Sequence, residues 1–140
     1  MLIFKIASQR DFEIIAKRDK HISREILKDK IDRVEVYVTH EDEKFAGWIR
    51  YGLFWDNTPF MNMLHLLPEH RGKGIGRKFV QYWEQEMKVK GYKKVLTSTQ
   101  QNEHAQHFYL ALGYIAIGGF IQTSGALAED SFEIMLAKEL

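Results

Sequence analysis

The stretch best suited to binding chemistry is a glycine-rich turn over residues 71–76, which reads Arg-Gly-Lys-Gly-Ile-Gly. An apolar run precedes it and ends at Pro68, because proline cannot donate to a sheet ladder. A helical pattern follows over residues 75–90. Glycines let backbone N–H groups approach a ligand closely, and the first turn of a helix carries unpaired N–H groups and partial positive charge. The order strand, glycine turn, helix therefore predicts a phosphate site, with Arg71 and Lys73 beside it.

The common nucleotide-binding loops do not match this turn. A P-loop needs Gly-x4-Gly-Lys-Ser/Thr, which the chain lacks, and the dinucleotide fingerprint needs Gly-x-Gly-x-x-Gly where this turn has Gly-x-Gly-x-Gly. The three glycines could also do no more than make a tight turn. By itself the turn predicts a phosphate-bearing ligand without specifying which one.

A second polar and aromatic group lies in a predicted helix over residues 103–112, which Asn102 can cap and Gly113 can end. Tyr109 in this helix is either a core aromatic or a functional phenol. His104 and His107 are three residues apart, a spacing that suits a metal pair. With no third ligand evident, an exposed helix face is the favoured interpretation, and we expect no metal.

Taken together, the two stretches resemble the GCN5-related N-acetyltransferase (GNAT) superfamily. The first family motif, Gln/Arg-x-x-Gly-x-Gly/Ala, matches residues 71–76. The second, Asn-x-x-Ala-x-x-Phe-Tyr-x-x-Leu-Gly-Phe/Tyr, matches residues 102–114. The order of elements is also similar to the family's over nearly the whole chain. The resemblance implies an acetyl-CoA-dependent N-acetyltransferase that moves an acetyl group directly to a primary amine of a small molecule, peptide or protein.

The resemblance also implies a role for each site residue. The pyrophosphate of acetyl-CoA would lie on the loop and the start of the helix: Arg71, Gly72, Lys73, Gly74, Ile75, Gly76 and Arg77. The pantetheine arm would lie between the strands 60–67 and 95–99 and pair with the backbone of Leu64 and Leu66. An N–H group near Leu66 would polarise the acetyl carbonyl. Asn102 would contact the pantetheine arm or a bound water, and Tyr109 would act as general acid on the departing thiolate.

The general base is the least determined part of the site. GNAT enzymes often use a glutamate on the strand before the glycine turn, but residues 60–67 contain none. His65 is the titratable residue there, and its pKa near neutrality suits proton transfer, although its side chain could point to the other face of the sheet. Glu133, His21, His40 and a water chain are the alternatives. Without a competent base, the chain would be a non-catalytic acyl-CoA-binding or sensor module; a nucleotide-binding domain is a third alternative.

Aromatic residues of the predicted strand over residues 45–55 are candidates for the acceptor site. Trp48, Tyr51 and Trp55 would line a site for a cationic amine near Asp56, or else fill the core.

Composition narrows the function classes. The 140 residues are 45% hydrophobic and 28% charged, as in globular proteins, and the net charge of +1 does not indicate a nucleic-acid partner. The absence of cysteine excludes a cysteine nucleophile and thiolate metal sites. No apolar run approaches a membrane span and the first residues do not read as a signal peptide, so we expect a cytoplasmic protein. Acetyl-CoA and an amine are the expected partners, and family analogy adds a possible homodimer.

The elements that must position these residues follow from hydrophobic periodicity and turn signals. We expect one α+β domain over residues 1–140, similar to an α/β sandwich. The resemblance implies a mixed, mostly antiparallel seven-stranded sheet with splayed central parallel strands. The predicted strands cover residues 2–7, 34–39, 45–55, 60–67, 95–99, 114–121 and 132–136. The predicted helices cover residues 9–18, 23–32, 75–90 and 103–112.

Overall fold

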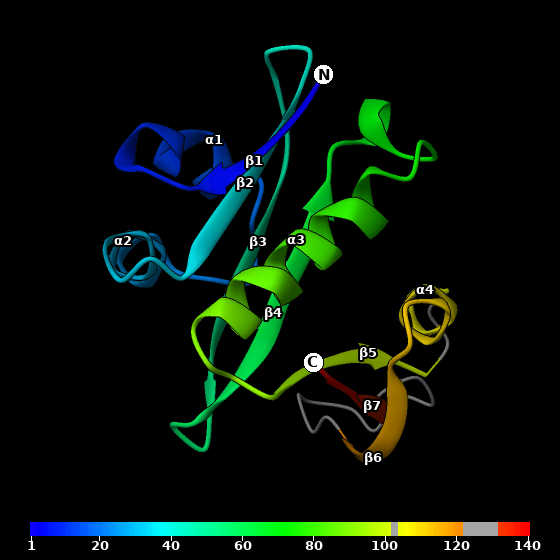
Figure 1. The fold of residues 1–140 in the computed structure, drawn as a ribbon. Helices are drawn as coiled ribbons and strands as arrows, with labels where there is room; N and C mark the ends of the chain where they lie inside the picture. The colour runs from blue at the N-terminus through cyan, green and yellow to red at the C-terminus, as the bar shows by residue number, and fades with distance from the viewer. Residues whose placement is uncertain (102–103, 122–131) are drawn as a thin grey trace. The chain divides into compact units, whose positions relative to one another are not determined.

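The computed structural model describes residues 1–101, 104–121 and 132–140 (Figure 1). The strands are β1 (Leu2–Ile6), β2 (Val36–Glu41), β3 (Lys44–Phe54), β4 (Thr58–Leu66), β5 (Lys94–Gln100), β6 (Ile115–Ile121) and β7 (Phe132–Glu139). The helices are α1 (Phe12–Ala16), α2 (Arg24–Asp32), α3 (Ile75–Val89) and α4 (Ala105–Ala111). Two short 3₁₀ turns, η1 (Gln9–Asp11) and η2 (Pro68–His70), complete the described elements.

The strands pair in the order β1-β2-β3-β4-β5-β7-β6, an open seven-stranded sheet, which confirms the predicted fold class. Strands β1 and β2, β2 and β3, β5 and β7, and β6 and β7 are antiparallel. Strands β4 and β5 are parallel, and their register consists of two pairs, Phe60 with Leu96 and Met61 with Thr97. The helix between these strands supplies the crossover that parallel neighbours require.

The chain forms two compact units. The first comprises Met1–Gly52 and Asn62–Trp83, and the second comprises Leu53–Met61 and Glu84–Leu140. Strand β4 and helix α3 therefore contribute residues to both units. The single domain expected from the sequence stays a prediction.

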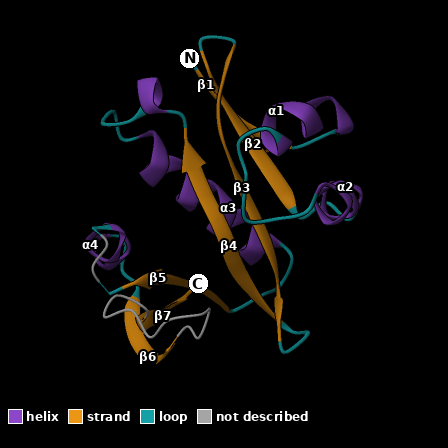
Figure 2. Cartoon of the chain, turned by 180° about the vertical axis from the view of Figure 1, so that it is seen from behind, coloured by secondary structure: helices purple, strands orange, loops and turns teal. Residues whose placement is uncertain are grey.

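In the first unit, both faces of the strands are covered. Figure 2 shows α1 and α2 on one face and α3 on the other. The α1–α2 face buries this cluster: Ala7, Ile15, Leu27, Ile31, Val36, Val38, Trp48 and Leu67. On the α3 face, ring centroids are 5.4 Å apart for Phe4 and Phe79, and 5.9 Å apart for Tyr51 and Trp83. Because both faces are packed, consecutive residues of β2 and β3 are buried instead of alternating between core and solvent.

Local signals were mostly confirmed, with three corrections. Ser8 and Asp11 form the predicted capping box, but the helix expected over residues 9–18 is a 3₁₀ turn followed by α1, which ends at Ala16. Val34 has a φ of +61°, so β2 begins two residues later than the alternating valines suggested. Trp55 has a φ of +54° and lies in the turn after β3, outside the strand.

The second unit holds β5, β7, β6 and α4 together with the first residues of β4 (Figure 1). The hydroxyl of Thr97 donates to the carbonyl of Met61 at 3.0 Å, which adds to the short parallel pairing. The Tyr114 hydroxyl donates to Glu84 at 2.8 Å, and Lys138 donates to the other oxygen of that carboxylate at 2.9 Å. Burial, assisted by the charge of Glu84, raises the pKa of Tyr114 and keeps the phenol protonated.

A buried ion pair fixes the connection between α1 and α2 in the first unit. The Asp19 carboxylate accepts from Arg50 Nε at 2.8 Å, from Arg50 Nη2 at 3.3 Å and from Trp48 Nε1 at 3.2 Å. It also accepts from the backbone N–H of His21 at 3.1 Å. Burial by itself would raise the pKa of Asp19, but the hydrogen bonds and charge of Arg50 outweigh burial and lower the pKa. Four donors therefore hold a charged carboxylate inside the unit.

We expect Asp19→Asn to destabilise the protein by about 3–5 kcal/mol, because Arg50 would be left buried without its counter-charge. Asp29→Asn, an exposed change on α2, is the matched control and should have little effect. The pair should also make stability depend on pH. The pKa of Asp19 is lower in the folded protein than in the unfolded chain, where it is about 3.9. The ion pair therefore stabilises the fold at pH values above the unfolded pKa, and this stabilisation is lost as the pH falls through the folded pKa. Urea unfolding of the variant should approach that of the wild type at low pH; a constant difference would contradict this account.

Candidate active site

The glycine loop connects η2 to α3 in the first unit. Gly72 and Gly74 have φ values of +76° and +79°, and an added Cβ at either position would meet nothing within 4 Å. Glycine is therefore needed for the backbone conformation, and the side of the loop where a Cβ would project is open. Helix α3 begins at Ile75, so the N–H groups of its first turn have no partners within the helix. This arrangement has the features of an anion site built from backbone groups.

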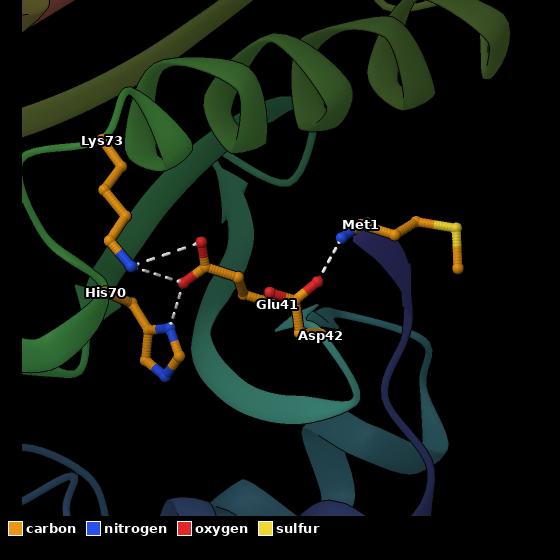
Figure 3. A network of polar contacts seen from close by, with 5 residues as sticks. All are labelled: Met1, Glu41, Asp42, His70 and Lys73. Carbon is orange, nitrogen blue, oxygen red and sulfur yellow. Dashed lines mark hydrogen bonds and ion pairs between the residues drawn. The ribbon is translucent and has the colours of Figure 1, made fainter.

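The side chains of the loop hold it to its surroundings. Arg71 Nε donates to the carbonyl of Leu66 at 2.8 Å, which ties the loop to the end of β4. Ile75 is buried and anchors the start of α3. Lys73 Nζ lies 3.1 and 3.4 Å from the two carboxylate oxygens of Glu41, in the network shown in Figure 3. The two loop cations predicted from the sequence are thus both engaged with protein groups.

His65, the candidate base, lies on β4 and is half-buried. Its ring packs on Trp48, with centroids 4.7 Å apart, so it belongs to the face of the first unit that α1 and α2 cover. A Cβ at Gly47 would lie 2.2 Å from the carbonyl oxygen of His65, so only glycine allows β3 to approach the histidine this closely.

Burial has the largest effect and lowers the pKa of His65, and the positive charge of Arg71 lowers the pKa further. The charge of Asp19 opposes this shift, and Arg18 adds a smaller lowering effect. The imidazole is therefore neutral near pH 7. A neutral imidazole can accept a proton, which is the state that a general base requires.

The alternative bases have other surroundings. In the second unit, Glu133 accepts from the Ser98 hydroxyl at 2.7 Å. In the first, the His40 ring packs edge-on against Phe45, with centroids 5.8 Å apart, and His21 is exposed.

Tyr109, the candidate acid, lies on α4 in the second unit and is 7% exposed. Its hydroxyl is 3.7 Å from Met61 Sδ, a weak acceptor, and its ring packs edge-on against Phe108 and Tyr114. Met61 of β4 thus lies beside the phenol. Asn102 falls outside the described residues.

The aromatic residues considered for an acceptor site do not share one face. Trp48 and Tyr51 are buried on opposite faces of the first unit, Trp48 toward α1 and α2 and Tyr51 toward α3. These two fill core, as the alternative interpretation had it. Trp55 is 81% exposed in the β3–β4 turn.

The described residues show neither a metal-binding cluster nor a membrane-spanning helix. Over residues 1–101, 104–121 and 132–140, no group of three histidine, aspartate or glutamate side chains is arranged to hold a metal ion, and His104 and His107 are both exposed. In the same part of the chain, no helix has the length and apolar character needed to cross a membrane.

The sequence argument missed several polar residues around the loop and β4. Asp19, Arg50 and Glu41 make the contacts described above, and His70 Nδ1 lies 2.6 Å from Glu41 Oε1, but none of the four belongs to a recognisable motif. The sequence contained one indication of these contacts: Arg50 is a cation inside the otherwise apolar segment Trp-Ile-Arg-Tyr, and a buried cation needs an acidic partner. Its partner lies 31 residues away in the chain, which no local pattern can reveal.

With the fold and loop geometry in place, the family can be stated. The model of the acetyltransferase (GNAT) family matches residues 4–114. The chain belongs to this family, and it is therefore an acetyltransferase by class. No curated protein matches the chain.

Solved structures share the fold. A GNAT-family acetyltransferase from Bacillus cereus is 24% identical, with a TM-score of 0.77 over 99% of this chain and 97% of the other. The ribosomal-protein-S18-alanine N-acetyltransferase of Escherichia coli is 14% identical, with a TM-score of 0.80 over 99% and 94%. A putative streptothricin acetyltransferase from Bacillus anthracis, solved with acetyl coenzyme A, is 19% identical, with a TM-score of 0.68 over 75% and 61%.

We expect the His65 ring to titrate below its usual pKa of about 6.5, since it is half-buried beside two arginines. NMR titration of the imidazole resonances measures this midpoint. Arg71→Gln should raise the midpoint, because it removes one of the depressing charges, whereas Arg77→Gln on the exposed side of α3 should not. A wild-type midpoint at or above the usual value would show that His65 is not kept neutral by its surroundings.

Proposed function

We propose that this protein is an acetyl-CoA-dependent N-acetyltransferase that transfers the acetyl group directly to a primary amine of a small molecule, peptide or protein. The observation that carries the proposal is the open glycine loop, with two left-handed glycines, placed between β4 and the first turn of α3 in a chain of the GNAT family. The Bacillus anthracis neighbour solved with acetyl coenzyme A and the Escherichia coli enzyme named for an alanine acceptor add support.

In this proposal, the pyrophosphate of acetyl-CoA binds the N–H groups of residues 72–77. The loop conformation and the unpaired N–H groups at the start of α3 support that placement. The pantetheine arm runs along the backbone of Leu64 and Leu66. The two-pair register of β4 with β5 ends at Met61, and this supports a ligand beside the later residues of β4, where the Leu66 carbonyl already accepts from Arg71. Asn102 takes the position on the pantetheine arm that the family motif assigns.

The reaction needs a proton acceptor for the amine, a donor that stabilises the negative oxygen of the intermediate, and a proton donor for the departing thiolate. His65 takes a proton from the ammonium form of the acceptor, and the neutral amine then attacks the thioester carbonyl. An N–H group near Leu66 stabilises the negative oxygen of the tetrahedral intermediate. As the C–S bond breaks, Tyr109 gives its proton to the thiolate, since a phenol of pKa about 10 is protonated at neutral pH. The acetylated nitrogen releases its extra proton to water, and the Tyr109 phenolate takes a proton back from water. The products are the acetylated amine and CoA with a free thiol.

Thiol release measured over a panel of amines tests this function. The panel should include polyamines, amino acids, aminosugars and peptides with free N-termini, each assayed with acetyl-CoA in excess. We expect turnover with at least one class. Tight acetyl-CoA binding without turnover on any amine would instead favour the second candidate, a non-catalytic acyl-CoA-binding module. The observation behind that candidate is the absence of a carboxylate on β4.

Removing the Tyr109 hydroxyl distinguishes an acetyltransferase from a non-catalytic acyl-CoA-binding module. Tyr109→Phe keeps the ring that packs on Phe108 and Tyr114 and removes only the proton donor. We expect kcat to fall by about 10²–10⁴-fold, the usual contribution of a positioned acid, with the Kd of acetyl-CoA retained. Tyr92→Phe is the control and should leave kcat unchanged. An unaltered kcat in Tyr109→Phe would remove Tyr109 from the mechanism.

Placing a large side chain at Gly74 tests whether the loop binds the pyrophosphate of acetyl-CoA. In Gly74→Trp the side chain meets open space, so the fold loses only about 1–2 kcal/mol from the left-handed backbone, while the indole blocks the approach of a phosphate. Gly91→Trp is a matched control, because Gly91 has a φ of +96° and also meets nothing within 4 Å. Calorimetry should show acetyl-CoA binding abolished in the first variant and retained in the second. Equal binding in both variants, or binding of NAD in place of acetyl-CoA, would contradict the proposed site.

A further inference from the structure

A single carboxylate joins the first half of the glycine loop, and the residue before the loop, to the end of β2. Glu41, the last residue of β2, has its Oε1 atom 2.6 Å from His70 Nδ1 and 3.1 Å from Lys73 Nζ. Figure 3 shows the two nitrogens converging on this carboxylate, beside the ion pair between Asp42 and the Met1 amine. All of these residues belong to the first unit.

The two partners of Glu41 stand on either side of the first glycine. His70 ends η2 and is buried, with 5% of its surface exposed, so it is a fixed point of the fold. Lys73 lies between the left-handed glycines Gly72 and Gly74 and is half-exposed. A bond from Glu41 to each residue therefore restrains the stretch of backbone that holds Gly72.

The electrostatics favour a charged carboxylate here. The hydrogen bond from His70, followed by that from Lys73, holds the pKa of Glu41 below its ordinary value. A hollow of about 330 Å³ has Glu41, Asp42, Glu69, His70 and Lys73 in its lining. The Lys73 ammonium is therefore bonded to the Glu41 carboxylate at a hollow that two further acidic residues also line.

The three glycines of residues 71–76 make the loop backbone flexible, so contacts such as those of Glu41 are needed to order it. A segment with three glycines in six residues loses more conformational entropy on ordering than other sequences do. A loop that is already ordered before its ligand arrives binds more tightly, because that cost has been met during folding.

We propose that Glu41 is a positioning residue of the cofactor loop: through His70 and Lys73 it holds the loop backbone in its ligand-ready conformation. This inference rests on the proposed function of the loop as the acetyl-CoA pyrophosphate site. It assigns Lys73 to the support of the loop, so the phosphate is bound by backbone N–H groups and the Lys73 side chain acts through Glu41.

The test is a KM and kcat comparison with a matched control. Glu41→Gln keeps the shape of the side chain and removes its charge, and we expect KM for acetyl-CoA to rise about three- to tenfold with kcat nearly unchanged. Glu43→Gln, an exposed change in the same turn, should alter neither value. Amide hydrogen exchange at residues 71–76 of the ligand-free protein should become faster in Glu41→Gln and stay the same in Glu43→Gln.

A double-mutant cycle with Lys73→Met separates positioning from direct contact. If Lys73 acts through Glu41, Lys73→Met raises KM in the wild type but adds nothing in the Glu41→Gln background. A further rise in that background would mean that Lys73 binds the phosphate itself, and would overturn the inference. Normal acetyl-CoA binding with unchanged KM and unchanged exchange in Glu41→Gln would overturn it as well. A wild-type protein that binds no acetyl-CoA would overturn the proposed function, and this inference with it.

Discussion

The loop between β4 and α3 keeps a left-handed backbone at Gly72 and Gly74, and the proposed pyrophosphate site requires its N–H groups to be uncovered. Glycine permits that shape but has no side chain to hold it, so the neighbours have to do so. Arg71 bonds the end of β4, Ile75 fills a buried site at the start of α3, and Glu41 reaches the loop from the β2–β3 turn. These three residues support the loop and leave open the space into which a Cβ at Gly72 or Gly74 would project.

The rest of the first unit supplies a rigid base for this loop and for His65. Strands covered on both faces leave little freedom to β4, and Gly47 brings β3 close to it at the histidine. The Asp19–Arg50 pair fixes the α1–α2 connection against Trp48, on which the His65 ring rests. The Asp19 carboxylate therefore stabilises the fold and also holds Trp48, the residue on which His65 packs.

Patterns local in sequence predicted most of the fold, and the loop that carries the proposed site. Periodicity, the Ser8 capping box and the turn glycines located the strands and helices because each depends on residues a few positions apart. Contacts between distant residues escaped prediction: Arg50 with Asp19, and Glu41 with His70 and Lys73. Val34 and Trp55 were wrongly predicted to lie in strands, because β-branched and aromatic residues are typical of strands. In the structure both adopt positive φ values next to the ends of strands.

We infer that the backbone N–H groups of residues 72–77 bind the pyrophosphate of acetyl-CoA. Titration of ¹⁵N-labelled protein with acetyl-CoA, followed by amide chemical shifts, measures this contact residue by residue. We expect the largest changes at these amides, and the same changes with CoA that lacks the acetyl group, because the pyrophosphate is common to both ligands. Saturable binding of acetyl-CoA that leaves the amides of residues 72–77 unmoved would contradict the account.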